Sequence, residues 1–297
     1  MMLGLHPMLM GETAKPEPPG VWKAYASASP RTIRSVIHVN GLFVAVGDGD
    51  TIQTSTDGAN WTLRSSGTAG DLRSVTHGKG QFVAVGDKCQ IYTSPDGIGW
   101  ASHGTPEEAA GGMWSVAYGN GLFVAGGDGG TMYTSWDGVY WAARAGHYAA
   151  NAYALIYTDY TGSLFVAGCG GGRFQTSTDG IFWMPGDDFG VSAVRAMAYV
   201  GGVFVAVGDG GVTQTGTNGK KWTRRPGAHT SDIHALAHGG GLFVAGGDSG
   251  ALQRSADGIT WQADAGAQTG DIRSLVYAGG QFVAGGQGGQ IQKMRWP

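Results

Sequence analysis

The sequence predicts an all-β fold, a seven-bladed β-propeller of four-stranded blades, from three observations. Phe-Val-Ala recurs seven times at intervals of 39 to 42 residues. A turn of the form Asp-Gly-x-x-Trp begins 14 residues after the start of each of the first six copies, and one further Trp precedes the first copy. A period near 40 residues in a β-rich sequence is typical of a propeller. The copies start at Phe43, Phe82, Phe123, Phe165, Phe204, Phe243 and Phe282, and the turns start at Asp57, Asp96, Asp137, Asp179, Asn218 and Asp257.

Each repeat divides into four predicted strands. In the second repeat these strands start at Leu72, Gln81, Gln90 and Trp100. Gly-Asp and Asp-Gly pairs separate them, as hairpins need residues that accept a positive φ. The continuous apolar Phe-Val-Ala run fits a strand that is buried on both faces, which is what a sheet packed between two other sheets requires.

The ring is predicted to close through the N-terminal strand. Trp22 precedes Phe43 by 21 residues, the same spacing that separates Trp61 from Phe82. The last repeat ends where its own Asp-Gly-x-x-Trp turn would begin. An open ring would leave unpaired sheet edges and unburied blade faces. We therefore expect Trp22 to Ser27 to form the outermost strand of the last blade.

The composition excludes several classes of function. Charged residues make up 14% of the 297 residues, and the formal net charge of −3 argues against nucleic acid as a partner. No apolar stretch is long enough to span a membrane. No metal-ligand spacing appears, and no cofactor is predicted. Cys89 and Cys169 lie two blades apart and are predicted to be buried free thiols.

Histidine and tyrosine alternate at the position five residues before each Phe-Val-Ala. A position that accepts either residue indicates packing and hydrogen bonding within the blade, not a set of metal ligands. The residues there are His38, His77, Tyr118, Tyr157, Tyr199, His238 and Tyr277, with an insertion allowed in the fourth repeat.

Two other repeat positions are predicted to meet on one rim of the central channel. We call the residue nine before each Phe the ring position and the residue five after it the turn position; consecutive antiparallel strands bring both to the same face. The ring position reads Arg34, Arg73, Trp114, Tyr153 (after a three-residue insertion), Arg195, His234 and Arg273. The turn position reads Asp48, Asp87, Asp128, Gly170, Asp209, Asp248 and Gln287.

This rim has two interpretations. One is a set of structural Arg–carboxylate pairs within or between blades. The other is a basic rim with an aromatic sector, to which His147 and Tyr148 before the fourth blade and Trp136 and Tyr140 of the third blade add. Aromatic faces stack on sugars and arginine binds carboxylate or phosphate in a fork, so such a rim suits an anionic glycan or another acidic partner.

Residues 1–19 are predicted to be a docking arm with a Pro-rich spacer, and residues 20–297 to be the propeller. The arm lacks the basic start and clean apolar run of a signal peptide. Flexible apolar side chains fill irregular grooves, so we expect the arm to bind another protein; folding back on its own propeller is the alternative. The apolar side chains of the arm are Leu3, Leu5, Met8, Leu9 and Met10.

The stretch from Ser55 to Trp61 resembles the Asp-box hairpin of sialidase-like propellers, from which it differs by one residue between Asp and Gly. The resemblance implies that the Asp caps its own turn and that the Trp packs between blades. Sialidases have six blades and carry a Phe-Arg-Ile-Pro type motif, which this chain lacks. Because fold resemblance does not carry function, we expect no hydrolase activity and no catalytic residues.

The repeat from Gly121 to Gly138 resembles propeller repeats of bacteriophage tail and other virion proteins. This resemblance implies a non-enzymatic virion component, made in the host cytoplasm. It would attach to other virion or assembly proteins through residues 1–19 and display the propeller for structural contact or for a host receptor such as a surface glycan.

Two alternatives remain. The chain is similar to the seven-bladed photosystem II assembly factors, whose Arg patch Arg34, Arg73, Arg195 and Arg273 would mimic, although it lacks their export signal and lipid-anchor cysteine. That resemblance implies a protein-interaction scaffold. A carbohydrate-binding lectin is the third possibility.

Overall fold

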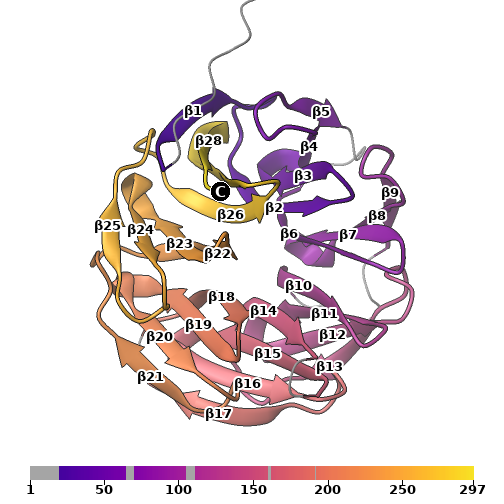
Figure 1. Cartoon of the computed structure of the whole chain (residues 1–297). Helices are drawn as coiled ribbons and strands as arrows, with labels where there is room; N and C mark the ends of the chain where they lie inside the picture. The colour runs from indigo at the N-terminus through magenta and orange to yellow at the C-terminus, as the bar shows by residue number, and fades with distance from the viewer. Residues whose placement is uncertain (1–19, 65–69, 105–110, 160–161, 191) are drawn as a thin grey trace, which may run out of the picture.

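The computed structural model describes residues 20–297 apart from 65–69, 105–110, 160–161 and 191. These residues form seven four-stranded antiparallel sheets arranged as the blades of a ring (Figure 1). The predicted all-β seven-bladed propeller is therefore confirmed. In every blade the first strand lies innermost and the fourth lies outermost, and a short 3₁₀ turn joins the second strand to the third.

The strands follow the repeat, with the following bounds. Blade one holds β2 (Ile33–Val39), β3 (Leu42–Gly47), β4 (Thr51–Ser55) and β5 (Thr62–Arg64). Blade two holds β6 (Leu72–Gly78), β7 (Gln81–Gly86), β8 (Ile91–Ser94) and β9 (Ala101–His103). Blade three holds β10 (Met113–Gly119), β11 (Leu122–Gly127), β12 (Thr131–Ser135) and β13 (Ala142–Ala145). Blade four holds β14 (Ala152–Thr158), β15 (Leu164–Cys169), β16 (Arg173–Ser177) and β17 (Met184–Asp188).

The remaining blades continue in the same order. Blade five holds β18 (Val194–Val200), β19 (Val203–Gly208), β20 (Thr213–Gly216) and β21 (Trp222–Arg225). Blade six holds β22 (Ile233–Gly239), β23 (Leu242–Gly247), β24 (Leu252–Ser255) and β25 (Gln262–Asp264). Blade seven holds β26 (Ile272–Ala278), β27 (Gln281–Gly286), β28 (Gln290–Arg295) and β1 (Trp22–Ala26). The 3₁₀ turns are η1 (Asp48–Asp50), η2 (Asp87–Cys89), η3 (Asp128–Gly130), η4 (Gly170–Gly172), η5 (Asp209–Gly211), η6 (Asp248–Gly250) and η7 (Gln287–Gly289).

The N-terminal strand closes the ring, as predicted. β1 pairs antiparallel with β28, from Trp22 opposite Met294 to Ala26 opposite Gln290. The Trp22 side chain is 5% exposed and packs in a cluster with Phe282 and Met294 of blade seven and Leu242 of blade six. The hydrogen-bonded ladder and the core thus both join the two ends of the described residues.

The hydrophobic core lies between the blades. Val44, Val83 and Val124 of the Phe-Val-Ala strands are fully buried, and clusters of apolar side chains join each blade to its neighbour. Such a strand packs on both of its faces, which explains its continuous apolar pattern. Cys89 and Cys169 are both buried free thiols, as expected.

The Asp-Gly-x-x-Trp turns cap themselves. In blade one, the Asp57 carboxylate accepts hydrogen bonds from the backbone N–H groups of Ala59 and Asn60, each at 2.8 Å. The Ser55 hydroxyl accepts one from Gly58, and the Trp61 indole donates to the Gly58 carbonyl. These bonds satisfy the turn internally, so its recurring geometry needs no ligand.

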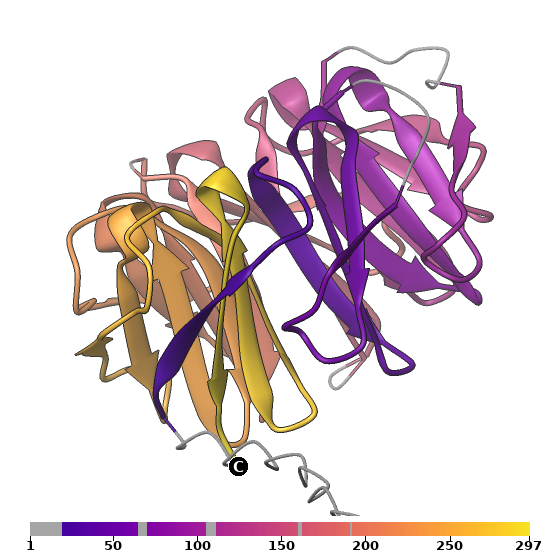
Figure 2. The same cartoon turned by 90° about the horizontal axis from the view of Figure 1, so that it is seen from above.

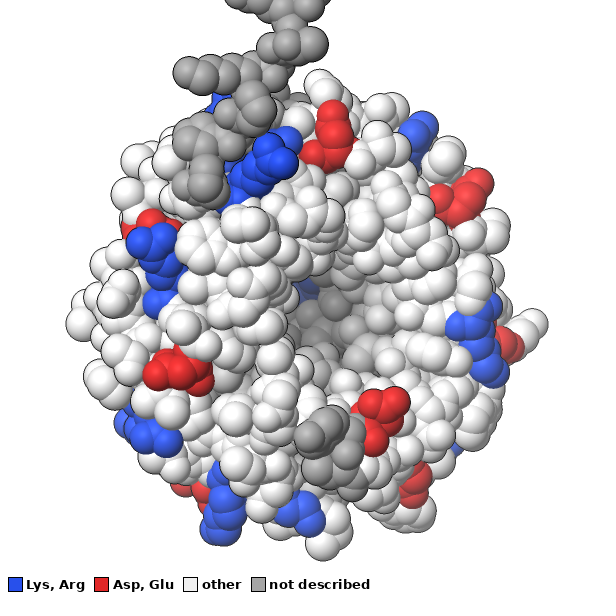
Figure 3. Space-filling view, in the orientation of Figure 1, with Lys and Arg blue, Asp and Glu red and all other residues white. Residues whose placement is uncertain are grey.

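The two faces of the propeller differ. We call the face formed by the 3₁₀ turns η1 to η7 the ring face, and the opposite face, formed by the Asp-Gly-x-x-Trp turns and the first hairpin of each blade, the box face. The start of β1 and the C-terminus both lie at the box face (Figure 2). On that face charged side chains gather mainly at the outer edge, and the channel opening is bordered mainly by other residues (Figure 3).

The three histidines of the His/Tyr position pack on the phenylalanine of their own blade. The ring centroids of His38 and His77 lie 4.4 and 4.8 Å from those of Phe43 and Phe82, and His238 lies 4.4 Å from Phe243. Burial lowers the pKa of all three imidazoles below their usual value. The predicted packing role is consistent with these contacts.

We expect these histidines to make the fold less stable as the pH falls. A folded-state pKa below the unfolded-state pKa means that the unfolded protein binds more protons, so their contribution is complete above about pH 6.5 and is lost below it. Replacing His38, His77 and His238 by Tyr, the residue found at the same position in other blades, should flatten this dependence. Denaturant unfolding at about pH 7.5 and about pH 5.5 measures it, above the range in which ordinary carboxylates titrate. If the triple variant loses as much unfolding free energy between these two pH values as the parent does, the histidines are not the cause of the pH dependence.

Candidate functional site

A β-bulge in the first strand of each blade presents the ring position to the channel. The register between the first and second strands shifts between Ile33 and Ser35 in blade one, and at the matching place in every other blade. The residue skipped by each shift is the ring residue, Arg34 in blade one. A bulge leaves its extra residue out of the ladder and re-aims the side chain. The fold therefore points seven repeat-breaking side chains at one opening.

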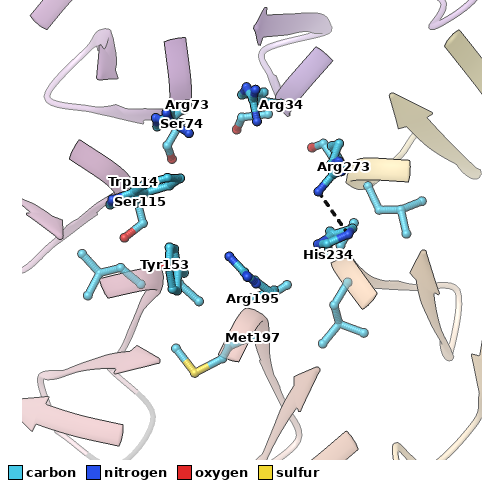
Figure 4. A pocket seen from close by; sticks show the side chains of 18 of the residues that line it. Arg34, Arg73, Ser74, Trp114, Ser115, Tyr153, Arg195, Met197, His234 and Arg273 are labelled. Carbon is cyan, nitrogen blue, oxygen red and sulfur yellow. Dashed lines mark hydrogen bonds between the residues drawn. The ribbon is translucent and has the colours of Figure 1, made fainter. Parts of the chain in front are cut away.

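These side chains surround the ring-face end of the channel. They line a cavity of about 190 Å³ together with the residues that follow them on the inner strands. Figure 4 shows them arranged around the opening. We call this set the channel ring: Arg34, Arg73, Trp114, Tyr153, Arg195, His234 and Arg273.

Most members of the channel ring are held by the aspartate at the turn position of their own blade. Arg34 donates a hydrogen bond through Nε to the Asp48 carboxylate, and Arg73 donates one in the same way to Asp87. Arg195 binds Asp209 with two parallel bonds of 2.6 and 3.0 Å. The structural Arg–carboxylate interpretation is thus correct, and the expected basic rim is wrong, because these cations are neutralised by neighbouring carboxylates.

The aromatic sector is stacked between two of these arginines. The Arg73 guanidinium lies 3.8 Å from the centroid of the Trp114 ring, and that of Arg195 lies 4.3 Å from the Tyr153 ring. The two aromatic rings meet edge to face at 5.0 Å, and the Trp114 indole donates to Asp128. Cation–π contacts therefore fix both aromatic side chains. Because Arg73 covers one face of Trp114, that face is not available for stacking on a sugar.

Blades six and seven form a connected polar group. His234 Nε2 lies 2.6 Å from an Asp248 carboxylate oxygen, and Arg273 Nη2 donates to Asp271 at 2.6 Å. Arg273 Nη1 also lies 3.1 Å from His234 Nε2. Burial lowers the pKa of His234, and the nearby Arg273 lowers it further, whereas the bond to Asp248 raises it.

Two sets of residues that support the channel ring were not predicted. The Ser35, Ser74 and Ser274 hydroxyls accept hydrogen bonds from backbone N–H groups of the next blade. Asp71 and Asp271 accept a bond from the central residue of the preceding blade's 3₁₀ turn. The sequence signal was the Asp-x-Arg-Ser pattern at the start of β6 and β26.

Four residues assigned to the rim lie elsewhere. His147 and Tyr148 stand in the loop before β14, where Arg173 lies 5.6 Å from the Tyr148 ring, and neither lines the cavity. Trp136 and Tyr140 belong to the turn after β12 and lie at the box face, 63% and 81% exposed. None of the four therefore extends the aromatic sector at the cavity. Trp136 and Tyr140 cannot, because the third and fourth strands meet at the opposite face, and His147 and Tyr148 lie at the ring face but outside the cavity lining.

The remaining predictions concern the docking arm, metal sites and membrane-spanning segments. The arm residues Leu3, Leu5, Met8, Leu9 and Met10 lie outside the described residues. Within the described part of the protein, no group of three or more His, Cys, Asp or Glu side chains is placed to hold a metal ion. Among these same residues no helix has the length and apolar character needed to cross a membrane.

Comparisons with known proteins show the fold. No family model matches the sequence, and a search of curated proteins finds no match. The structure of YCF48 bound to D1 peptide is similar with a TM-score of 0.74 and 21% identity over 93% of this chain and 95% of that chain. YCF48 from Cyanidioschyzon merolae has a TM-score of 0.72 and 16% identity over 92% and 98% of the two proteins.

A more distant protein shares the same architecture. The WD40 propeller domain of Doa1 superimposes with a TM-score of 0.74 and 14% identity over 94% of this chain and 98% of that chain. At these identities the likeness concerns the fold alone. It gives no support to a virion role or to a glycan ligand.

Proposed function

We propose that this chain is a non-enzymatic protein-interaction propeller that receives a segment of a partner protein at the channel ring. The observation that carries this proposal is the convergence of all seven ring residues on one cavity through seven bulges. The residues that build the blades repeat from copy to copy. The ring residues instead change from Arg to Trp, Tyr and His, so their identity is not required by the repeat.

The size and chemistry of the cavity favour a peptide. A volume of about 190 Å³ admits one or two side chains and not a folded domain. Arg, Trp and Tyr are the residues most enriched at the energetic centres of protein interfaces. The similar propeller YCF48 is known in complex with a peptide, which supports the same use here.

A peptide selection with two ring variants tests the proposal. Peptides selected from a random library on the whole protein should lose about 1–3 kcal/mol of binding free energy with Trp114→Ala, the scale of a buried aromatic anchor. Arg73→Ala should instead lower the free energy of unfolding by about 1–2 kcal/mol, because Asp87 loses its charged partner.

Phe182→Ala is the matched control for this selection, since Phe182 is 75% exposed at the box face. It should leave both binding and unfolding unchanged. If the selected peptides bind the Trp114→Ala protein as tightly as the parent, or lose affinity only with Phe182→Ala, the channel ring is not the binding site.

We propose a virion role, with attachment through residues 1–19, as the second candidate function. The described residues begin with Gly20 at the box face, opposite the channel ring, where the Gly20 N–H donates to the Arg295 carbonyl. Attachment through residues 1–19 would leave the channel ring free for a host receptor. A protein lacking residues 1–15 should then keep its peptide affinity and fail to enter a virion. Full incorporation of that protein would contradict attachment by the arm.

A further inference from the structure

Blade seven breaks the pairing rule of the channel ring. Blades one, two and five carry Arg at the ring position and Asp at the turn position, and blade four has lost both, with Tyr153 and Gly170. Blade seven alone keeps the arginine, Arg273, and replaces the aspartate, with Gln287. The other blades therefore show that an arginine at the ring position normally binds a carboxylate at the turn position.

The aspartate at the turn position has two roles, which blades three and five display together. In blade five, Asp209 accepts the Ala193 backbone N–H at 3.3 Å through one oxygen and the Arg195 guanidinium at 2.6 Å through the other. In blade three, Asp128 accepts the Gly112 N–H at 2.7 Å and the Trp114 indole. One carboxylate oxygen thus accepts the backbone N–H and the other accepts the ring residue; in blade five Arg195 also reaches the first oxygen, at 3.0 Å.

Gln287 fills only the first of these roles. Its amide oxygen accepts the Asp271 backbone N–H at 3.4 Å, the bond that matches Ala193 to Asp209. The other polar atom of the amide is an NH₂ donor, whereas the second oxygen of each aspartate is an acceptor. A donor cannot hold a guanidinium, and Arg273 turns instead to Asp271 of its own blade and toward His234 and Asp248 of blade six.

The carboxylates around the arginine come from different positions in blades two and seven. Blade two has the same Asp-x-Arg sequence and holds three ionised groups, Asp71, Arg73 and Asp87, whose sum is −1. Blade seven itself holds only Asp271 and Arg273, and the Arg273 guanidinium also lies 3.9 Å from the Asp248 carboxylate of blade six. Arg273 is 31% exposed and lines the cavity, so a further carboxylate can reach it from the channel.

We propose that blade seven binds a carboxylate of the ligand in the position that the other blades fill with their own aspartate. The guanidinium of Arg273 and the amide NH₂ of Gln287 both donate to this carboxylate. This inference rests on the proposed function and names the chemistry of the peptide. The carboxylate comes either from the free C-terminus of the peptide or from one of its Asp or Glu side chains.

Three small peptides separate these two sources. Acetyl-Ala-Ala with a free C-terminus, the same peptide as its amide, and acetyl-Glu-Ala amide are titrated into the whole protein, and the arginine Nε–H signals are followed by ¹⁵N NMR. Binding of the first peptide alone identifies a C-terminal carboxylate, and binding of the third identifies an Asp or Glu carboxylate. The neutral amide should not bind.

Gln287→Asp is the decisive variant, because it supplies the missing carboxylate from the protein itself. It should weaken binding of the carboxylate peptide by about tenfold or more, the value of a hydrogen bond to a charged group. Its melting temperature should be equal to or above that of the parent, so loss of binding cannot be ascribed to unfolding.

Gly170→Asp is the matched control. It places the same residue at the turn position of blade four, where Tyr153 stands in place of an arginine and an added Cβ meets no atom closer than 3.7 Å. It should leave carboxylate binding within about twofold of the parent. Equal binding by the parent and Gln287→Asp proteins, or equal losses in both variants, would overturn the blade-seven site.

The experiments distinguish a failure of the blade-seven carboxylate site from a failure of peptide binding at the channel ring. If the selected longer peptides depend on Trp114 but no carboxylate peptide is sensitive to Gln287→Asp, the channel ring binds peptides and the blade-seven carboxylate site is wrong. If no peptide of either kind depends on the channel ring, both proposals fall.

Discussion

A protein that begins at residue 28 is expected to lose its fold, whereas one that begins at residue 16 is expected to keep it. The longer deletion removes all of β1, from Trp22 to Ala26, and leaves β28 as an unpaired edge. It also uncovers Phe282 and Met294, both of which are buried. Loss of the Trp22 side chain alone costs about 3–5 kcal/mol, a large part of the stability of an ordinary domain.

Sedimentation and thermal melting of the two truncated proteins measure this effect. Trp22→Ala in the full-length protein serves as a milder variant, which should melt lower but remain soluble. A monodisperse protein of residues 28–297 that melts like the parent would show that the ring does not depend on β1.

Gly86→Ala is expected to destabilise the protein by about 3 kcal/mol, because no side chain fits at this position. A Cβ on Gly86 would lie 2.0 Å from the Asp71 carbonyl oxygen, which belongs to the backbone and cannot swing away. The same close approach lets the Asp87 N–H donate to that oxygen at 2.9 Å, and so sets the Asp87 carboxylate beside Arg73. We therefore expect both stability and peptide binding at the channel ring to fall.

Gly99→Ala is the control for this substitution. Gly99 lies in the Asp-Gly-x-x-Trp turn of the same blade, and a Cβ there meets nothing within 4 Å. Denaturant unfolding should show a change of at most about 0.5 kcal/mol for this variant. Equal stabilities of the two variants would contradict the close-packing argument.

The fold was predictable because the same sequence motifs recur in successive blades. Phe-Val-Ala, the Asp-Gly-x-x-Trp turn and the spacing of Trp22 each follow from backbone geometry that every blade must satisfy, and the strand bounds and ring closure agree with them. The meeting of Arg and Asp on one rim was predictable for the same reason, since alternate hairpins of a blade lie at opposite ends of the sheet.

The details of the site were less accessible from sequence. The charge of the rim depends on which carboxylate each arginine reaches, and the pairing of Arg34 with Asp48 removes the basic character that counting residues implied. The stacking of Arg73 on Trp114 depends on the distance between two blades, which the period does not contain. The bulge that aims each ring residue inserts one residue in every copy and leaves no mark on the repeat itself.

The most direct test of the account is to map where a selected peptide lies on the propeller. A photoreactive group placed on the peptide, followed by mass spectrometry of the cross-linked protein, identifies the residues in contact. We expect cross-links to the starts of the inner strands, near Trp114, Tyr153 and Arg273. Cross-links confined to the box face, near Trp136 and Phe182, would contradict it.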